Sequence, residues 1–106
     1  MTVYCFDLDG TLVTQTQDKE GKMHYSEALP ISRSIQKLRK LHEKGHRIII
    51  QTARGSGSGI NYENLTRQQL KEFNIPYHDL NIGKKPSADI YIDDKAINVK
   101  DWLKNA

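Results

Sequence analysis

Acidic side chains follow two apolar stretches of this 106-residue sequence. Asp7 and Asp9 come at the end of the apolar run that opens the chain, and Asp93 and Asp94 follow a second run that ends at Ile92. Open parallel sheets bind their ligands in the crevice beyond the carboxyl ends of their strands. Carboxylates gathered there form the oxygen set that a hard divalent cation such as Mg²⁺ prefers. Asp and Gly are also common turn residues, so a simple turn at residues 7–11 stays an alternative.

The stretches that must position these acids alternate between two periodicities. Continuous apolar runs predict buried strands, and apolar residues spaced by three and four predict helices. The sequence predicts strands over 3–6, 46–51, 77–82 and 88–92, and helices over 31–44, 60–73 and 96–103. A strand, a helix and a strand form a parallel, right-handed unit almost without exception. Asp7 and Thr52 should therefore leave neighbouring strands at the same edge of one sheet, with residues 12–29 forming a loop or small hairpin.

Length and charge limit what the protein can be. A chain of 106 residues buries roughly 60 to 70% of its unfolded surface, which predicts one domain over 1–106 without a second lobe. The net charge of +3 includes no long basic block, so it does not favour a nucleic-acid partner. A single cysteine, Cys5, excludes an internal disulfide. No apolar run approaches the ~20 residues of a membrane span and no signal peptide is recognisable, so we expect a cytoplasmic protein.

Four segments together resemble a known family. Asp7-Leu8-Asp9-Gly10-Thr11 is similar to the first motif of the haloacid dehalogenase-like (HAD) phosphohydrolases, Asp-x-Asp-Gly-Thr, without alteration. Thr52, Lys85 and the pair Asp93-Asp94 stand where that family has its second, third and fourth motifs. The segment 83–96 looks like the closing part of small capless members, and the resemblance spans residues 3–96. It implies a three-layer α/β/α Rossmann-like fold with a parallel sheet and no cap.

The resemblance also implies a role for each acid. Asp7 would be the nucleophile that forms an aspartyl-phosphate. Asp9 would protonate the leaving oxygen and later deprotonate water, and an acid at this position favours a phosphatase or phosphomutase over an ATPase or dehalogenase. Mg²⁺ would be held by Asp7, Asp93 and the backbone carbonyl of Asp9, with Asp94 acting directly or through water.

The phosphoryl oxygens need donors as well. The resemblance implies that the Thr52 hydroxyl and the Lys85 ammonium supply them, although Thr52 could instead cap a turn and Lys84 competes with Lys85. Further substrate contacts are expected from the backbone around three residues, Gly10, Thr11 and Ala53. Arg54, which precedes the glycine-serine loop 55–59, could clamp an anionic substrate or pair with an acid of the protein.

Neither 12–29 nor 77–83 is long enough for a cap domain. Water exclusion would then need a neighbouring subunit in a homo-oligomer, or a large substrate that covers the site itself. The leading hypothesis is a magnesium-dependent phosphomonoesterase for a small phosphate ester, with a sugar phosphate of surface-polysaccharide biosynthesis as its most favoured form. The alternatives are a phosphatase of a nucleic-acid end or phosphoprotein, and a regulatory domain that binds phosphate without catalysis.

Overall fold

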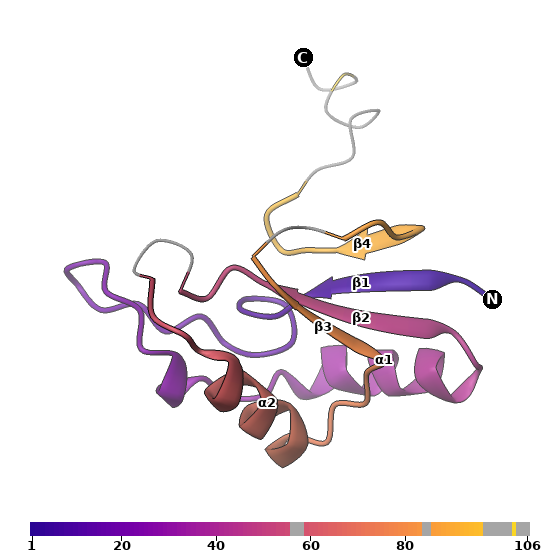
Figure 1. Cartoon of the computed structure of the whole chain (residues 1–106), viewed down its shortest axis with the longest axis horizontal. Helices are drawn as coiled ribbons and strands as arrows, with labels where there is room; N and C mark the ends of the chain where they lie inside the picture. Colours follow the sequence, from indigo (N-terminus) through magenta and orange to yellow (C-terminus); the bar gives the residue numbers. More distant parts are fainter. Residues whose placement is uncertain (56–58, 84–85, 97–102, 104–106) are drawn as a thin grey trace.

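The computed structural model describes residues 1–55, 59–83, 86–96 and 103. Its elements in chain order are β1 (Val3–Asp7), a short 3₁₀ helix (Tyr25–Glu27), α1 (Ser32–Glu43), β2 (Arg47–Thr52), α2 (Glu63–Glu72), β3 (Asp79–Ile82) and β4 (Ile90–Ile92). The four strands form one sheet in the order β3-β2-β1-β4 (Figure 1). Every strand pairing is parallel, which confirms the predicted α/β fold class and all four predicted strands.

The strand register brings the predicted site residues to one edge. Asp7 pairs with Gln51, so β1 ends beside the last residues of β2. Phe6 pairs with Ile92, so Asp93 leaves β4 next to the end of β1 on its other side. Because all three strands run in the same direction, Asp7 lies between the end of β2 and the acids that follow β4.

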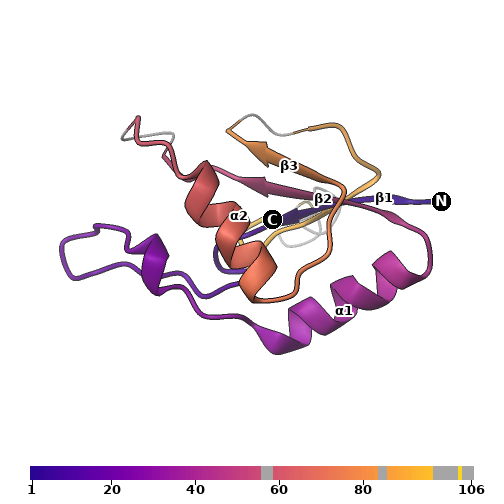
Figure 2. The same ribbon diagram turned by 60° about the horizontal axis from the view of Figure 1, so that its bottom comes forward.

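The α-helices α1 and α2 lie on the same face of the sheet, as Figures 1 and 2 show. Alternate strand residues point toward them, since successive side chains of a strand face opposite sides. The buried cluster beneath the helices contains Phe6, Leu8, Leu12, Val13, Ala28, Ile35, Leu38, Ile48, Ile50, Leu70 and Ile75. The predicted helix 96–103 is described only at Ala96 and Leu103, so the third layer of the predicted arrangement lies outside the described residues.

The predicted helix boundaries are close to those observed. α2 begins at Glu63, three residues later than predicted, and the Asn61 side chain accepts the Glu63 backbone N–H at 2.9 Å. This bond satisfies a first-turn donor, as expected of a capping residue, although Tyr62 immediately precedes the helix. Within the described ranges, no helix has the length and apolar character needed to cross a bilayer.

Residues 12–29 form a hairpin-like excursion whose two ends are buried. Leu12, Val13 and Ala28 belong to the core, while a bridge between Gln17 and Met23 closes the outer part. Asp18 Oδ1 accepts the backbone N–H groups of Glu20 and Lys22 at 3.0 and 2.9 Å, which fixes the turn. Residues 15–25, called the hairpin below, therefore form the small hairpin that the sequence predicted, and the residues that flank them join it to the core.

Candidate active site

A cavity of about 490 Å³ opens at the carboxyl edge of the sheet. Its lining comes from the ends of β1 and β2, from the residues after β4 and from the hairpin. Figure 1 shows the strand ends and the hairpin at the same end of the sheet. The lining residues are Asp7, Asp9, Gln15, Met23, Tyr25, Gln51, Thr52, Ala53, Arg54, Asp93, Asp94 and Lys95. Segments separated by more than forty residues thus meet in one concave site.

Three of the predicted acids converge on one point of this cavity. Asp7, Asp93 and Asp94 each offer a carboxylate oxygen, and these oxygens all lie within 4.8 Å of one another. The pKa of Asp7 is raised from 3.8 to about 6, first by burial and then by the neighbouring carboxylates of Asp93 and Asp94. Crowded carboxylates of this kind repel unless a cation shares them. The donors are all oxygen, so the set fits a hard divalent ion.

Local backbone geometry brings the two exposed acids close to Asp7. The Lys95 backbone N–H donates to Asp93 Oδ1 at 2.8 Å, which orients that carboxylate. Gly10 has a φ of +87°, and a Cβ built there would lie 2.3 Å from Asp94 Oδ2. Only glycine therefore lets Asp94 approach the turn that follows β1.

Asp9 lies in a different environment from Asp7, although one residue separates them. Its carboxylate accepts a hydrogen bond on each oxygen from Arg54. Nη2 donates to Oδ1 at 2.8 Å and Nε donates to Oδ2 at 3.0 Å. The Arg54 side chain is 0% exposed and that of Asp9 is 15% exposed. A two-pronged Arg–carboxylate pair fixes both position and orientation of the acid. Of the two alternatives for Arg54, the structure shows the pairing with an acid of the protein, which is Asp9.

Arg54 is itself held from the opposite side by α2 and the hairpin. Its Nη1 donates to Gln69 Oε1 at 2.7 Å and to Thr66 Oγ1 at 3.2 Å. The guanidinium carbon lies 4.8 Å from the centre of the Tyr25 ring, a cation–π contact. Gln69 Nε2 also donates to the Tyr25 carbonyl at 2.7 Å, so one amide links helix, arginine and hairpin.

Thr52 ends β2 and is almost fully buried. Its Oγ1 accepts the Arg54 backbone N–H at 3.2 Å, so it caps the turn after β2. Accepting this bond leaves the hydroxyl hydrogen available as a donor, so the capping and phosphoryl-binding roles are compatible. Ala53 lines the same cavity beside it.

Seven of the predicted residues line the cavity together: Asp7, Asp9, Thr52, Ala53, Arg54, Asp93 and Asp94. Gly10 acts by letting Asp94 approach. Thr11 lies apart, since it borders a different groove with Tyr4 and Phe6, and its buried hydroxyl has no hydrogen-bond partner among the described residues. Lys84, Lys85 and residues 56–58 fall outside the described residues, so the choice between the two lysines stays a prediction.

Sequence reasoning missed the support behind Arg54 and the hairpin wall. Thr66 and Gln69 are buried polar residues three apart on α2, next to the buried Leu70. Polar residues on the apolar face of a helix are the signal that could have revealed a buried partner. For Met23 and Tyr25, which follow a lysine-rich stretch, no comparable pattern was present.

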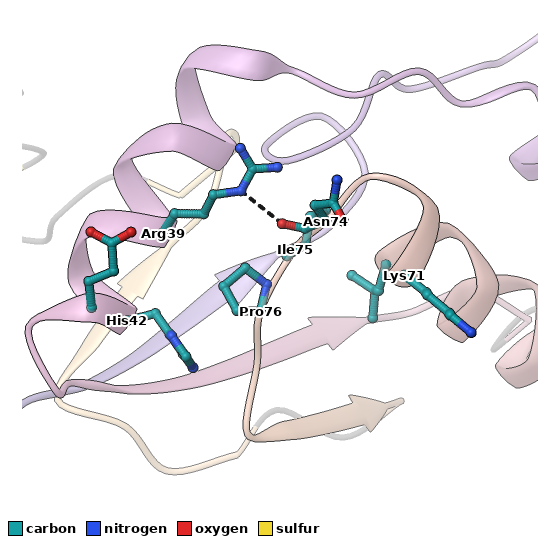
Figure 3. Close-up of a pocket in the computed structure, with 8 residues that line it drawn as sticks. Arg39, His42, Lys71, Asn74, Ile75 and Pro76 are labelled. Atoms are coloured by element: carbon teal, nitrogen blue, oxygen red, sulfur yellow. Dashed lines mark hydrogen bonds between the residues drawn. The ribbon is translucent and has the colours of Figure 1, made fainter.

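A second cavity, of about 430 Å³, lies between the C-terminal ends of α1 and α2 (Figure 3). There Arg39 donates to the carbonyls of Asn74 and Phe73 at 2.8 and 2.9 Å. Carbonyls that follow a helix lack partners within the helix, so this cation has a structural role. None of the residues around this cavity lines the acidic one.

The fold and this site can be compared with known proteins. A Vibrio cholerae protein of known crystal structure is 28% identical, with a TM-score of 0.65 over 96% of this chain and 87% of that one. A chain of the Pnkp1/Rnl/Hen1 RNA repair complex superimposes with a TM-score of 0.57 at 22% identity over 83% of this chain. A further structure of the Pnkp1/Rnl/Hen1 complex gives 0.59 at 20% identity over 97% of this chain.

These likenesses differ in what they cover. This chain spans 26% and 33% of the matched chains in the two complexes, so only the fold is shared with them. They agree with the predicted small, capless HAD-like fold. No curated protein sequence is similar enough to be matched.

The sequence itself decides the family. The family described as polynucleotide kinase 3 phosphatase matches residues 2–95, which include all four motifs and the whole described sheet. This match confirms the prediction of a HAD-type phosphatase. It names a single family, whereas the motifs resembled the HAD phosphohydrolases as a whole. The chain therefore belongs to the polynucleotide kinase 3 phosphatase family of phosphoric monoester hydrolases.

Proposed function

We propose that this protein removes a terminal phosphate from a nucleic-acid end, through an aspartyl-phosphate on Asp7. The observation that carries the proposal is the division of one cavity into two halves, with three carboxylates around Asp7 and an arginine-bound carboxylate at Asp9. One half suits a cation and a phosphoryl group. The other half suits proton transfer at the oxygen that leaves.

Asp7, Asp93 and Asp94 would hold Mg²⁺, together with the backbone carbonyl of Asp9. When bound, the cation neutralises these carboxylates and the phosphoryl oxygens, so that an anion can approach an anion. The raised pKa of Asp7 reflects its burial first and then its repulsion by Asp93 and Asp94, and a shared cation would relieve that repulsion.

In the first half-reaction, an Asp7 oxygen forms a bond to phosphorus as the bond to the leaving oxygen breaks. The proton that the leaving oxygen needs comes from Asp9. In the second half-reaction, Asp9 takes a proton from water, which attacks phosphorus and releases Asp7 and inorganic phosphate. The proton gained there serves the next leaving group, so Asp9 is a base and then an acid in turn.

Arg54 gives this exchange its geometry. Because both oxygens of Asp9 are bonded to a buried guanidinium, the carboxyl cannot rotate away from the cavity. Arg54 is therefore a positioning residue. The Thr52 hydroxyl adds a donor for a phosphoryl oxygen, and either Lys84 or Lys85 would supply the cation predicted from the third motif.

The substrate class follows from the family and from the openness of the site. The family description names a 3 phosphatase of polynucleotides, which favours the nucleic-acid end over the sugar phosphate expected first. None of the matched proteins points to polysaccharide biosynthesis. An uncapped cavity can admit the end of a polymer that is too large to be enclosed, which agrees with the same choice.

The test is a substrate comparison with Mg²⁺ present. We expect a 3′-phosphorylated oligonucleotide to be hydrolysed with a higher kcat/KM than the same oligonucleotide phosphorylated at its 5′ end, or than hexose phosphates. Asp7→Asn should abolish turnover, whereas the matched control Asp79→Asn, at the start of β3, should not. Faster hydrolysis of the hexose phosphates would overturn the substrate class.

A separate measurement tests the catalytic step itself. Beryllium fluoride with Mg²⁺ mimics an aspartyl-phosphate and should raise the thermal unfolding temperature of the native chain but not of Asp7→Asn. Absence of this stabilisation, together with absence of turnover on every phosphoester tried, would favour a regulatory domain that binds phosphate.

A further inference from the structure

The arrangement of the two acids fixes the direction in which a leaving group points. Phosphorus must lie beside Asp7, and the leaving oxygen must lie beside Asp9, which donates its proton. Asp9 is bonded to Arg54, and Arg54 lies over the Tyr25 ring at 4.8 Å. The part of the substrate beyond the leaving oxygen therefore extends away from Asp93 and Asp94, toward the hairpin.

The hairpin side chains that face this part of the substrate in the cavity carry no charge. The hairpin contributes Gln15, Met23 and Tyr25 to the cavity, which are an amide, a thioether and a phenol. Such a surface cannot neutralise a second phosphate or a carboxylate. It suits a flat, polarisable group with hydrogen-bonding edges, because methionine and tyrosine contact rings favourably and an amide both donates and accepts.

The wall is also rigid where the contact would occur. Tyr25 is fixed by Arg54 on one side and by the Tyr62 ring, which it meets edge-on at a centroid distance of 4.9 Å. Its backbone carbonyl is held by Gln69. The Met23 backbone is bridged to that of Gln17 across the hairpin. A side chain held as that of Tyr25 is loses little freedom on binding, so it can discriminate between leaving groups.

We propose that Gln15, Met23 and Tyr25 form a subsite for the terminal nucleoside, with Met23 and Tyr25 against its base or sugar and Gln15 at a polar edge. This assignment rests on the proposed function and adds the residues that select the leaving group. Stacking tolerates any base, so the subsite should accept all four bases with similar affinity.

The two methionines of the chain provide the test. Asp7→Asn protein labelled with ¹³C at the methionine methyl groups is titrated, with Mg²⁺ present, with a 3′-phosphorylated dinucleotide and separately with glycerol 2-phosphate. We expect the Met23 resonance to shift with the dinucleotide and to move little with glycerol 2-phosphate. Met1, at the chain end, is the internal control and should not shift. A Met23 resonance that stays in place while ³¹P signals show the dinucleotide bound would overturn the subsite.

Kinetics give a second readout on the active chain. Met23→Ser should lower the ratio of kcat/KM for the dinucleotide to kcat/KM for glycerol 2-phosphate by about tenfold, the upper end of what one contact between a methionine sulfur and a ring contributes. Lys19→Ser, at the hairpin tip, should leave the ratio unchanged. An unchanged ratio in Met23→Ser would contradict the subsite.

The two proposals fail in different ways. If wild-type protein hydrolyses no nucleic-acid end, the proposed function is wrong, yet the methyl titration still decides whether the hairpin binds a nucleoside. If nucleic-acid ends are hydrolysed while Met23 does not respond, the function stands and the subsite is wrong.

Discussion

Asp7 and Asp9 belong to one five-residue motif and line one cavity, yet the molecule surrounds them in opposite ways. Asp7 ends β1 and meets two further carboxylates that follow β4. Asp9 lies beyond the strand and meets a buried arginine. The fold therefore places negative charge around the first acid and positive charge against the second.

The difference shows how one motif can supply two roles. A carboxylate crowded by others has a raised pKa and binds a cation well, since the cation relieves the repulsion. A carboxylate bonded on both oxygens by Arg54 is fixed in orientation and suits proton transfer. Environments that separate two neighbouring acids are how acid and base roles are assigned in many enzymes.

The sharpest way to break the comparison is to remove the charge of Asp9. Asp9→Asn leaves the Arg54 guanidinium, which is 0% exposed, without its counter-ion. Breaking a buried pair in this way costs roughly 3 to 5 kcal/mol of unfolding free energy. The matched control is Asp79→Asn, which breaks the exposed pair with Arg47 and should cost at most about 1 kcal/mol. Urea unfolding measures both, and equal losses would mean that the buried pair does not stabilise the fold.

Much of the sheet and the acidic surroundings of Asp7 could be predicted from the sequence. The apolar runs of β1, β2 and β4 are local signals, and parallel right-handed connections place their ends together. That topology predicts only that Asp7 and Thr52 lie at one edge, and the family resemblance added Asp93 and Asp94 to the acids around the cation. The acids could be predicted because each one directly follows a strand that the sequence already indicates.

The surroundings of Asp9 depend on side-chain geometry that local sequence patterns do not encode. Whether Arg54 points into solvent or back to Asp9 is decided by Thr66 and Gln69, twelve and fifteen residues further along the chain. The contribution of Met23 and Tyr25 depends on how the hairpin folds over the cavity. Such contacts arise from packing between elements, so the sequence left the role of Arg54 open and gave no indication of the wall.

Removing the support behind Arg54 should have the next largest effect. Gln69→Leu deletes the acceptor for Arg54 Nη1 and the donor to the Tyr25 carbonyl, and leaves buried polar atoms unsatisfied. We expect a loss of about 2 kcal/mol in unfolding free energy, with a lower kcat because Asp9 is less well oriented. The neighbouring Gln68→Leu is the control, since Gln68 is exposed. If both variants behave alike in urea unfolding and turnover, Gln69 does not position the acid.

Competition between protons and Mg²⁺ for Asp7 tests the acidic side of the cavity. With a pKa of about 6, Asp7 is mostly ionised at pH 7 and mostly protonated at pH 5. Because a metal ligand must be deprotonated, the affinity for Mg²⁺ should fall by about tenfold between these pH values. Isothermal titration calorimetry at the two pH values measures the change. An affinity that is constant from pH 7 to pH 5 would mean that Asp7 is not a ligand.

The smallest expected effect is that of Asp7→Asn on the unfolding free energy, which should rise where Asp9→Asn lowers it. The folded-state pKa of Asp7 lies above 3.8, so its contribution to stability is complete below about pH 4 and is lost as the pH rises through about 6. Asp7→Asn removes this loss, because a neutral amide has no charge to desolvate and is not repelled by the carboxylates of Asp93 and Asp94. Without Mg²⁺ at pH 7, the variant should be more stable than wild type by about 1 kcal/mol, a value reduced for the solvent exposure of this half-buried group.

Thermal unfolding in a chelator measures this gain, which corresponds to a rise of roughly 4 to 8 °C for a domain of this size. The gain should vanish at pH 4, where Asp7 of the wild type is already neutral. Added Mg²⁺ should reverse the order, because it stabilises the wild type by binding and the variant much less. A destabilised Asp7→Asn in chelator at pH 7 would show that the acids around Asp7 do not repel it, and the contrast with Asp9 would then rest on Arg54 alone.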